Sequence, residues 1–206
     1  MKRALVAIVV LAGALAGVLV AHLLRNRAAA PPSLERATLY AERRALPAFE
    51  LIDQARAPFG PARLRGQWTF LFFGFVNCPD VCPTTLAMLA DVRARIATAS
   101  AGEVPQVILV SVDPGRDTPP VLAQYMSHFD PSFTGVTGDP AAIDTLTRAL
   151  GVAVAVGAPA DDGSYAVDHT AAIFLVDPAG RVAALFNTPH EARAIVRDYL
   201  KIVGTR

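Results

Sequence analysis

The two cysteines of the chain, Cys78 and Cys82, lie four positions apart in a proline-rich segment. They follow an apolar run at 69–75 and come directly before a predicted helix at 84–99. Side chains four positions apart on a helical turn share one face, with Cβ atoms about 5–6 Å apart. Two sulfur atoms there can bind one metal ion at about 2.3 Å each, or form a reversible disulfide. A helix N-terminus also favours the thiolate, which is the form that binds metals. The alternative, two buried and inert cysteines, leaves their pairing at this junction unexplained.

Two sulfur ligands rarely complete a metal site, and four histidines are candidates for a third ligand. His22 lies in an apolar N-terminal segment, His128 near the end of a predicted helix, and His190 at the start of the last one. For these three, surface or capping roles are sufficient. His169 stands directly before a predicted strand at 171–176, and in a thioredoxin-like topology that junction faces the cysteine segment. His169 is therefore a candidate ligand, with a structural histidine as the alternative.

Strand and helix patterns alternate along the chain and predict an α/β fold. The apolar runs at 69–75 and 107–112 indicate strands that are buried on both faces. Before Trp68, a Gly- and Pro-rich turn indicates an edge hairpin. The other expected elements are helices at 84–99, 118–129, 141–150 and 191–202, strands at 152–156 and 165–167 around a polar turn, and a hairpin of strands at 171–176 and 181–186. This order predicts a thioredoxin-like fold with an added N-terminal hairpin, preceded by one transmembrane helix.

The N-terminal segment carries the features of a membrane anchor. From Ala4 to Leu24, 21 residues carry no formal charge when His22 is neutral. As a helix this stretch would span a hydrocarbon core of about 30 Å. A cleaved signal peptide has a shorter apolar region next to a small-residue cleavage site, whereas here Arg25 and Arg27 precede the alanines. We therefore expect an uncleaved anchor at 1–27, with a removed signal peptide as the alternative.

Composition divides the remainder of the chain into a linker and a domain. Prolines and alanines at 28–32, followed by charged residues, predict a linker at 28–45 and a globular domain at 46–206. The chain has 19 basic and 18 acidic residues, which offers no basic surface for nucleic acid. Two cysteines also exclude a disulfide-rich scaffold and a four-cysteine zinc or iron–sulfur site within one chain.

Three segments that contain these residues closely resemble the Sco/SenC family of membrane-anchored copper proteins. They are 72–83 (FFGFVNCPDVCP), 111–119 (SVDPGRDTP) and 167–178 (VDHTAAIFLVDP). Their order and spacing agree with the family across residues 46–202. Val76 and Asn77 stand where the family often has Thr and His, and this departure removes no candidate ligand.

The resemblance implies that Cys78, Cys82 and His169 bind copper. Two thiolates suit soft Cu(I) and an imidazole completes a trigonal site, while harder Cu(II) can recruit an oxygen ligand or water. Asp113 and Asp168 are then candidates for side chains that orient the site. The alternatives are that Asp113 forms a turn and that Asp168 caps a strand end.

The resemblance further implies a function in copper transfer rather than catalysis. It indicates a metallochaperone in the cytoplasmic membrane of a bacterium, with its domain on the periplasmic side, that delivers copper to the binuclear site of cytochrome c oxidase during assembly. The implied partners are the copper-bearing oxidase subunit, a thiol reductase and another copper chaperone. The alternatives are a thiol–disulfide reductase that keeps the partner's cysteines reduced, and a copper or redox sensor. Since thiol exchange needs no third ligand, the role of His169 distinguishes the chaperone from the reductase.

Overall fold

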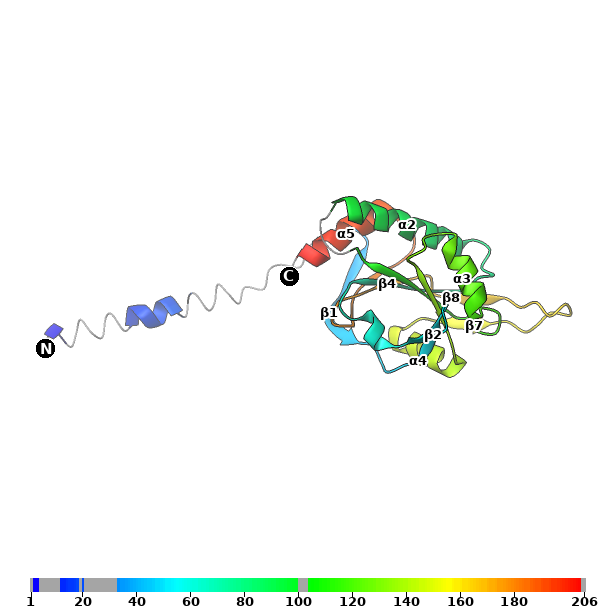
Figure 1. Ribbon diagram of the computed structural model, residues 1–206. Helices are drawn as coiled ribbons and strands as arrows, with labels where there is room; N and C mark the ends of the chain where they lie inside the picture. The colour runs from blue at the N-terminus through cyan, green and yellow to red at the C-terminus, as the bar shows by residue number, and fades with distance from the viewer. Residues whose placement is uncertain (1, 4–11, 19, 21–32, 100–103, 205–206) are drawn as a thin grey trace. The chain divides into compact units, whose positions relative to one another are not determined.

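The structure, a computed structural model, describes residues 2–3, 12–18, 20, 33–99 and 104–204. Two compact units can be distinguished, Met1–Ser33 and Leu34–Arg206. In the first unit, residues 12–18 are helical (Figure 1). Most of the predicted anchor, including His22, lies outside the described residues. Within the described part, no helix has the length and apolar character needed to cross a membrane.

The second unit is built on a mixed eight-stranded sheet in the order β1-β10-β9-β4-β5-β6-β2-β3. The central strand β4 is buried along its whole length, runs parallel to β5 and pairs antiparallel with β9. This burial confirms what the continuous apolar run predicted. The strands of the sheet are β1 (Ala37–Ala45), β2 (Leu51–Asp53), β3 (Pro58–Phe59), β4 (Thr69–Gly74), β5 (Gln106–Ser111), β6 (Thr134–Thr137), β9 (Ile173–Val176) and β10 (Arg181–Phe186).

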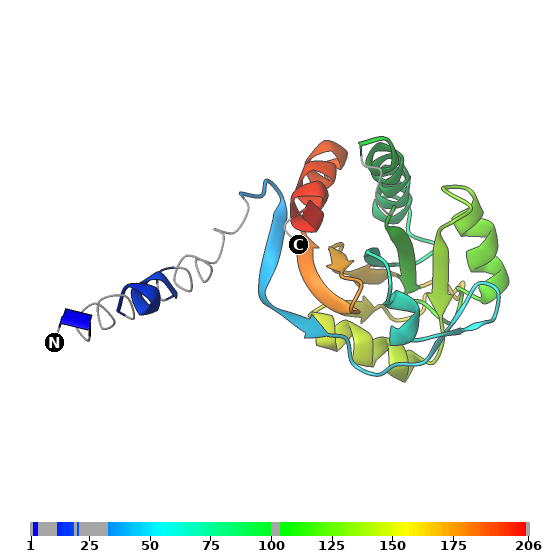
Figure 2. The same cartoon turned by 60° about the vertical axis from the view of Figure 1, so that its left-hand side comes forward.

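Helices cover both faces of this sheet. α2 (Val81–Ala99) and α5 (Ala192–Gly204) lie side by side on one face, and α4 (Pro140–Leu150) lies on the other (Figure 2). α3 (Pro119–Ser127) packs on β6, and a short 3-10 helix, η1 (Pro61–Leu64), follows β3. The bounds of α4 follow from its capping residues, because the Asp139 carboxylate accepts the N–H of Ala141 and Gly151 ends the helix at a φ of 71°.

One predicted segment has a different structure from the one expected. Residues 37–45, assigned from the sequence to a linker, form the edge strand β1, which pairs antiparallel with β10. Most side chains of β1 are exposed and several are charged, so its sequence lacks the alternation of apolar and polar residues that would predict a strand. The buried carboxylate of Asp198 accepts the N–H groups of Glu35, Arg36 and Ala37 and fixes the start of this strand. The linker prediction is therefore wrong for this stretch.

A separate two-stranded sheet lies outside the main sheet. It consists of β7 (Val154–Val156) and β8 (Val167–His169), which pair antiparallel with Val154 opposite His169. The turn between these strands extends away from the rest of the domain (Figure 1). The strand pair confirms the hairpin expected around the polar turn, but its second strand lies at 167–169 rather than 165–167 and therefore ends on His169.

Candidate metal centre

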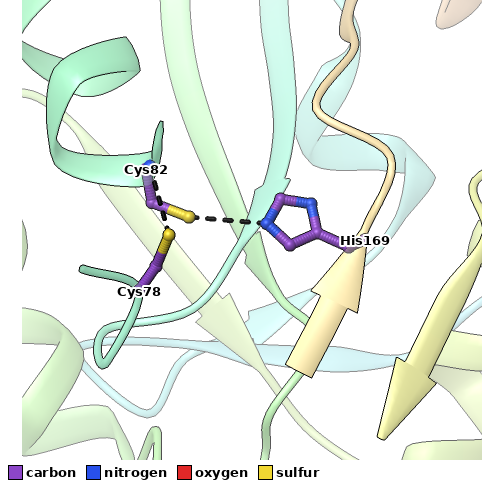
Figure 3. A group of neighbouring side chains, drawn as sticks. All are labelled: Cys78, Cys82 and His169. Carbon is purple, nitrogen blue, oxygen red and sulfur yellow. Dashed lines mark hydrogen bonds between the residues drawn. The ribbon is translucent and has the colours of Figure 1, made fainter. Parts of the chain in front are cut away.

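The structure brings the three predicted ligands together. One sulfur atom each from Cys78 and Cys82 and one ring nitrogen of His169 all lie within 4.8 Å of one another (Figure 3). The Sγ of Cys82 lies 3.5 Å from Nε2 of His169. Among the described residues, these three form the single group of Cys, His, Asp and Glu side chains that could hold a metal ion.

The two cysteines occupy different positions relative to α2. This helix begins at Val81, three residues before the predicted start, so Cys82 lies in its first turn and Cys78 precedes it. The predicted placement of both cysteines on one helical turn is therefore wrong for Cys78. Instead, the N–H of Cys82 donates to the Sγ of Cys78 at 3.4 Å. Since the first N–H groups of a helix have no partner within it, the sulfur of Cys78 satisfies one of them.

The end of β4 leaves room for the sulfur of Cys82. A Cβ atom at Gly74 would lie 3.0 Å from this sulfur and 3.0 Å from Cδ1 of Leu109, closer than Cβ atoms normally approach. Glycine therefore allows α2 to pack its first turn directly against the sheet. As a result Cys82 is 0% exposed, whereas Cys78 is 9% exposed.

Burial shifts the pKa values of two of the ligands, Cys82 and His169, in the apo-protein. It raises the pKa of the Cys82 thiol, and the neighbouring Cys78 adds to this effect. The position at a helix N-terminus predicted that the thiolate would be favoured. For Cys82 the effect of burial is larger than this and favours the thiol. Burial also lowers the pKa of His169, whose imidazole is therefore held in its neutral form.

The tautomer of His169 follows from its hydrogen bonds. Its Nδ1 lies 3.1 Å from the carbonyl oxygen of Thr170, and because a carbonyl only accepts, Nδ1 carries the proton. The lone pair of Nε2 then faces Cys82, where it can accept the thiol proton or bind a metal. The rings of Phe72 and Phe75 meet the imidazole edge-on, with centroid distances of 6.2 and 5.8 Å. These rings keep one side of the site apolar.

The two aspartates predicted to orient the site have separate positions. Asp113 is buried, and its carboxylate binds Arg116 and the hydroxyl of Tyr165, so it lies outside the ligand group. Asp168 is exposed beside His169 and lines an open pocket that Cys78 and His169 also border. Its charge raises the pKa of His169, but by less than burial lowers it.

The other two described histidines lie outside the ligand group. His128 is exposed at the end of α3 and its Nδ1 contacts the carbonyl of Gln124. His190, predicted to cap the last helix, donates from Nε2 to the carbonyl of Ala171 at 2.7 Å. It therefore joins the start of α5 to the segment between β8 and β9.

The sequence missed one residue that holds the cysteine segment in place. Asp117 lies just before α3, and its buried carboxylate accepts the hydroxyl of Ser111 at 2.6 Å and the N–H of Val76 at 3.1 Å. Burial raises the pKa of this carboxyl. The only sequence signal for this role is its place in the segment 111–119.

These features define an α/β protein with a soft-metal site of two sulfurs and one imidazole at the end of β4. The chain matches the SCO1/SenC family over residues 38–204. A Stutzerimonas stutzeri protein, whose name proposes copper binding, is 39% identical over 146 residues, which are 71% of each chain. The chain thus belongs to the SCO1/SenC family.

Solved structures with copper bound have the same fold. The copper-bound ScoI of Arabidopsis thaliana is 29% identical with a TM-score of 0.73, covering 78% of this chain and 99% of its own. The copper-bound ScoI of Bradyrhizobium japonicum is 36% identical with a TM-score of 0.66, covering 75% and 96%. These matches confirm the predicted thioredoxin-like fold.

Proposed function

We propose that this protein is a copper metallochaperone that holds copper between Cys78, Cys82 and His169. The observation that carries the proposal is the convergence of two sulfurs and one unprotonated imidazole nitrogen within 4.8 Å. Two thiolates and an imidazole match the preference of Cu(I) for soft ligands and low coordination number. The related ScoI proteins whose structures contain copper, and the similar Stutzerimonas protein, support the same metal.

The site also suits transfer of the metal. Cys78 and His169 border a pocket that is open to solvent, and Pro79, Asp80 and Val81 also line it. An incoming thiolate can therefore reach the metal while Cys82 still holds it. Because His169 provides a third ligand that thiol exchange would not need, binding and transfer are better supported than a thiol–disulfide reductase activity.

The family suggests the recipient. Sco proteins are associated with cytochrome c oxidase assembly, and we propose delivery to the binuclear copper site of its copper-bearing subunit. A thiol reductase and a second copper chaperone would act before this step, to reduce the cysteines and to supply the metal. We further propose that residues 1–27 anchor the chain in the cytoplasmic membrane of a bacterium, with the domain on the periplasmic side.

Metal content tests the proposal directly. The full-length chain, purified under reducing conditions, should contain copper near one ion per chain when copper and zinc are quantified together. Cys78→Ala or Cys82→Ala should abolish tight Cu(I) binding, because one thiolate cannot hold the ion alone. His169→Ala should weaken Cu(I) retention and alter the Cu(II) spectrum, with little change in thermal stability.

The exposed His128 provides a matched control. His128→Ala removes an imidazole outside the ligand group and should leave Cu(I) and Cu(II) binding unchanged. If His169→Ala retained the affinity of the unmodified chain for both oxidation states, the three-ligand site would be wrong. Zinc in place of copper would contradict the proposed cargo.

A further inference from the structure

A buried carboxylate outside the ligand group joins the hairpin of His169 to the main domain. Asp113 follows β5 and is 4% exposed. Its Oδ2 accepts from Nε of Arg116 at 2.5 Å, and its Oδ1 accepts the hydroxyl of Tyr165 at 2.6 Å. Both carboxylate oxygens are therefore occupied, one by a residue of the same loop and one by a residue of the hairpin.

Arg116 makes two direct contacts with Tyr165. Its guanidinium carbon lies 3.7 Å from the centroid of the Tyr165 ring, in a stacked cation–π contact. Its Nη1 donates to the carbonyl oxygen of Tyr165 at 3.2 Å. Tyr165 is thus bound through its hydroxyl, its ring and its backbone, so both its side chain and the local chain direction are fixed.

Few other hydrogen bonds connect the hairpin of β7 and β8 to the rest of the domain. β7 and β8 pair with each other and are not part of the main sheet. In the described part of the chain, Tyr165 makes the two hydrogen bonds that connect residues 153–170 to the rest of the domain, apart from the contact between His169 and Cys82. Tyr165 stands four residues before His169 and two residues before the start of β8, the strand that ends on His169.

The loop that binds Tyr165 also binds the cysteine segment. At its other end, the carboxylate of Asp117 accepts the N–H of Val76, two residues before Cys78. The loop at 111–117 therefore contacts the cysteine segment through Asp117 and the hairpin through Asp113 and Arg116. One short loop sets the spacing between the sulfur ligands and the imidazole.

We propose that Tyr165, held by Asp113 and Arg116, is a positioning residue that keeps His169 over the two cysteines. The inference rests on the proposed copper function, which it deepens. Without the hydroxyl of Tyr165, Oδ1 of Asp113 would lose its partner and the hairpin would keep a single hydrogen bond to the loop. Copper binding would then have to order the hairpin, and the affinity would fall.

The substitution Tyr165→Phe in the full-length chain tests this role, with Tyr40→Phe as the matched control. Tyr40 lies on β1 at the far edge of the sheet. Loss of a side chain that orients a metal ligand typically lowers affinity by about 10- to 100-fold. We expect this loss of Cu(I) affinity for Tyr165→Phe in a competition titration, and no loss for Tyr40→Phe.

A measurement without copper separates the inference from the proposed function. In the reduced apo-protein, the imidazole NMR signals of His169 should shift or broaden in Tyr165→Phe and stay unchanged in Tyr40→Phe. If the unmodified chain bound no copper, the copper proposal would fail, but the NMR comparison would still decide whether Tyr165 positions His169. Unchanged imidazole signals together with unchanged affinity would overturn the inference.

A second variant covers the case in which Tyr165→Phe does not fold. Arg116→Lys keeps the positive charge beside Asp113 but removes the planar stack on Tyr165 and the fixed donor to its carbonyl. It should produce the same change in the His169 signals and a lower Cu(I) affinity. Signals and affinity equal to those of the unmodified chain would count against the inference.

Discussion

Replacing Asp198 by alanine should remove the attachment of the N-terminal strand to the domain. The Asp198 side chain is 0% exposed on α5. Its two oxygens accept the N–H groups of Glu35, Arg36 and Ala37 at distances between 2.7 and 3.0 Å. Alanine leaves these three donors without their acceptor at the point where β1 begins.

The magnitude follows from the number of donors. A hydrogen bond contributes about 1 kcal/mol to stability, and one to a charged group about 1.5–3 kcal/mol. Fraying of the strand start would let water solvate part of the freed N–H groups, so we expect a loss of about 3 kcal/mol for Asp198→Ala. For a domain of this size, that loss corresponds to a decrease in Tm of about 6–12 °C.

Urea unfolding measures this loss with an internal reporter. The single tryptophan, Trp68, is 2% exposed and its ring lies 6.2 Å from that of Tyr199, the neighbour of Asp198. Its fluorescence therefore reports the region of the substitution. Asp144→Ala is the control, because it breaks an exposed pair with Arg148 that should contribute less than about 1 kcal/mol.

Two results would refute this reasoning. A change in the free energy of unfolding below about 1 kcal/mol would show that the three N–H groups do not depend on Asp198. A lower copper affinity of the folded variant would also contradict it. The ligands lie at the end of β4 and on β8, away from β1, so binding per folded molecule should stay unchanged.

The remaining predictions concern the redox state and the pH dependence of the site. An added disulfide oxidant, such as oxidised glutathione, should convert the apo-protein reversibly to a Cys78–Cys82 disulfide by thiol–disulfide exchange. The two sulfurs lie within 4.8 Å and can approach to the bond length of about 2.05 Å. Thiol trapping should detect the disulfide, and the oxidised form should not take up Cu(I) until reduced; equal affinity before and after oxidation would mean that other residues bind the metal. Cu(I) affinity should also rise at least about tenfold per pH unit near neutrality, because the raised pKa of Cys82 makes binding release its proton. His169 has a lowered pKa, so its imidazole is already neutral near pH 7 and releases no proton when it binds the metal. Competition titrations in which the Cu(I) affinity did not change with pH would contradict the assignment of Cys82 as the source of the proton.

The sequence could predict those elements whose burial leaves a continuous signal. β4 and β5 lie in the centre of the sheet, and their apolar runs predicted both strands within a residue or two. β6 went unpredicted because it has four residues, one of them glycine, and is defined by its pairing with β5 and β2. The predicted start of α2 lay just after Pro83, whereas the helix includes this proline in its first turn, where proline is tolerated because the N–H would have no partner.

The ligands were predictable for a reason that does not extend to their surroundings. Cys78, Cys82 and His169 are recognisable by residue type, spacing and position at strand ends. The contacts of Asp113 with Tyr165 and of Asp117 with Val76 span 52 and 41 positions of the chain. Such pairings leave no periodic pattern, because they depend on how the loop after β5 folds between two other segments.

The site therefore combines one fully buried ligand with two ligands that border the open pocket. Cys82 is fully buried in the first turn of α2 against Gly74, where the close packing leaves its sulfur little freedom to move. His169 lies on a hairpin outside the main sheet, and Cys78 stands at the open pocket. An incoming ligand meets Cys78 and His169 first, so exchange of the metal would begin there and end at Cys82. This order lets the protein retain the metal through its buried sulfur until the recipient has supplied ligands of its own.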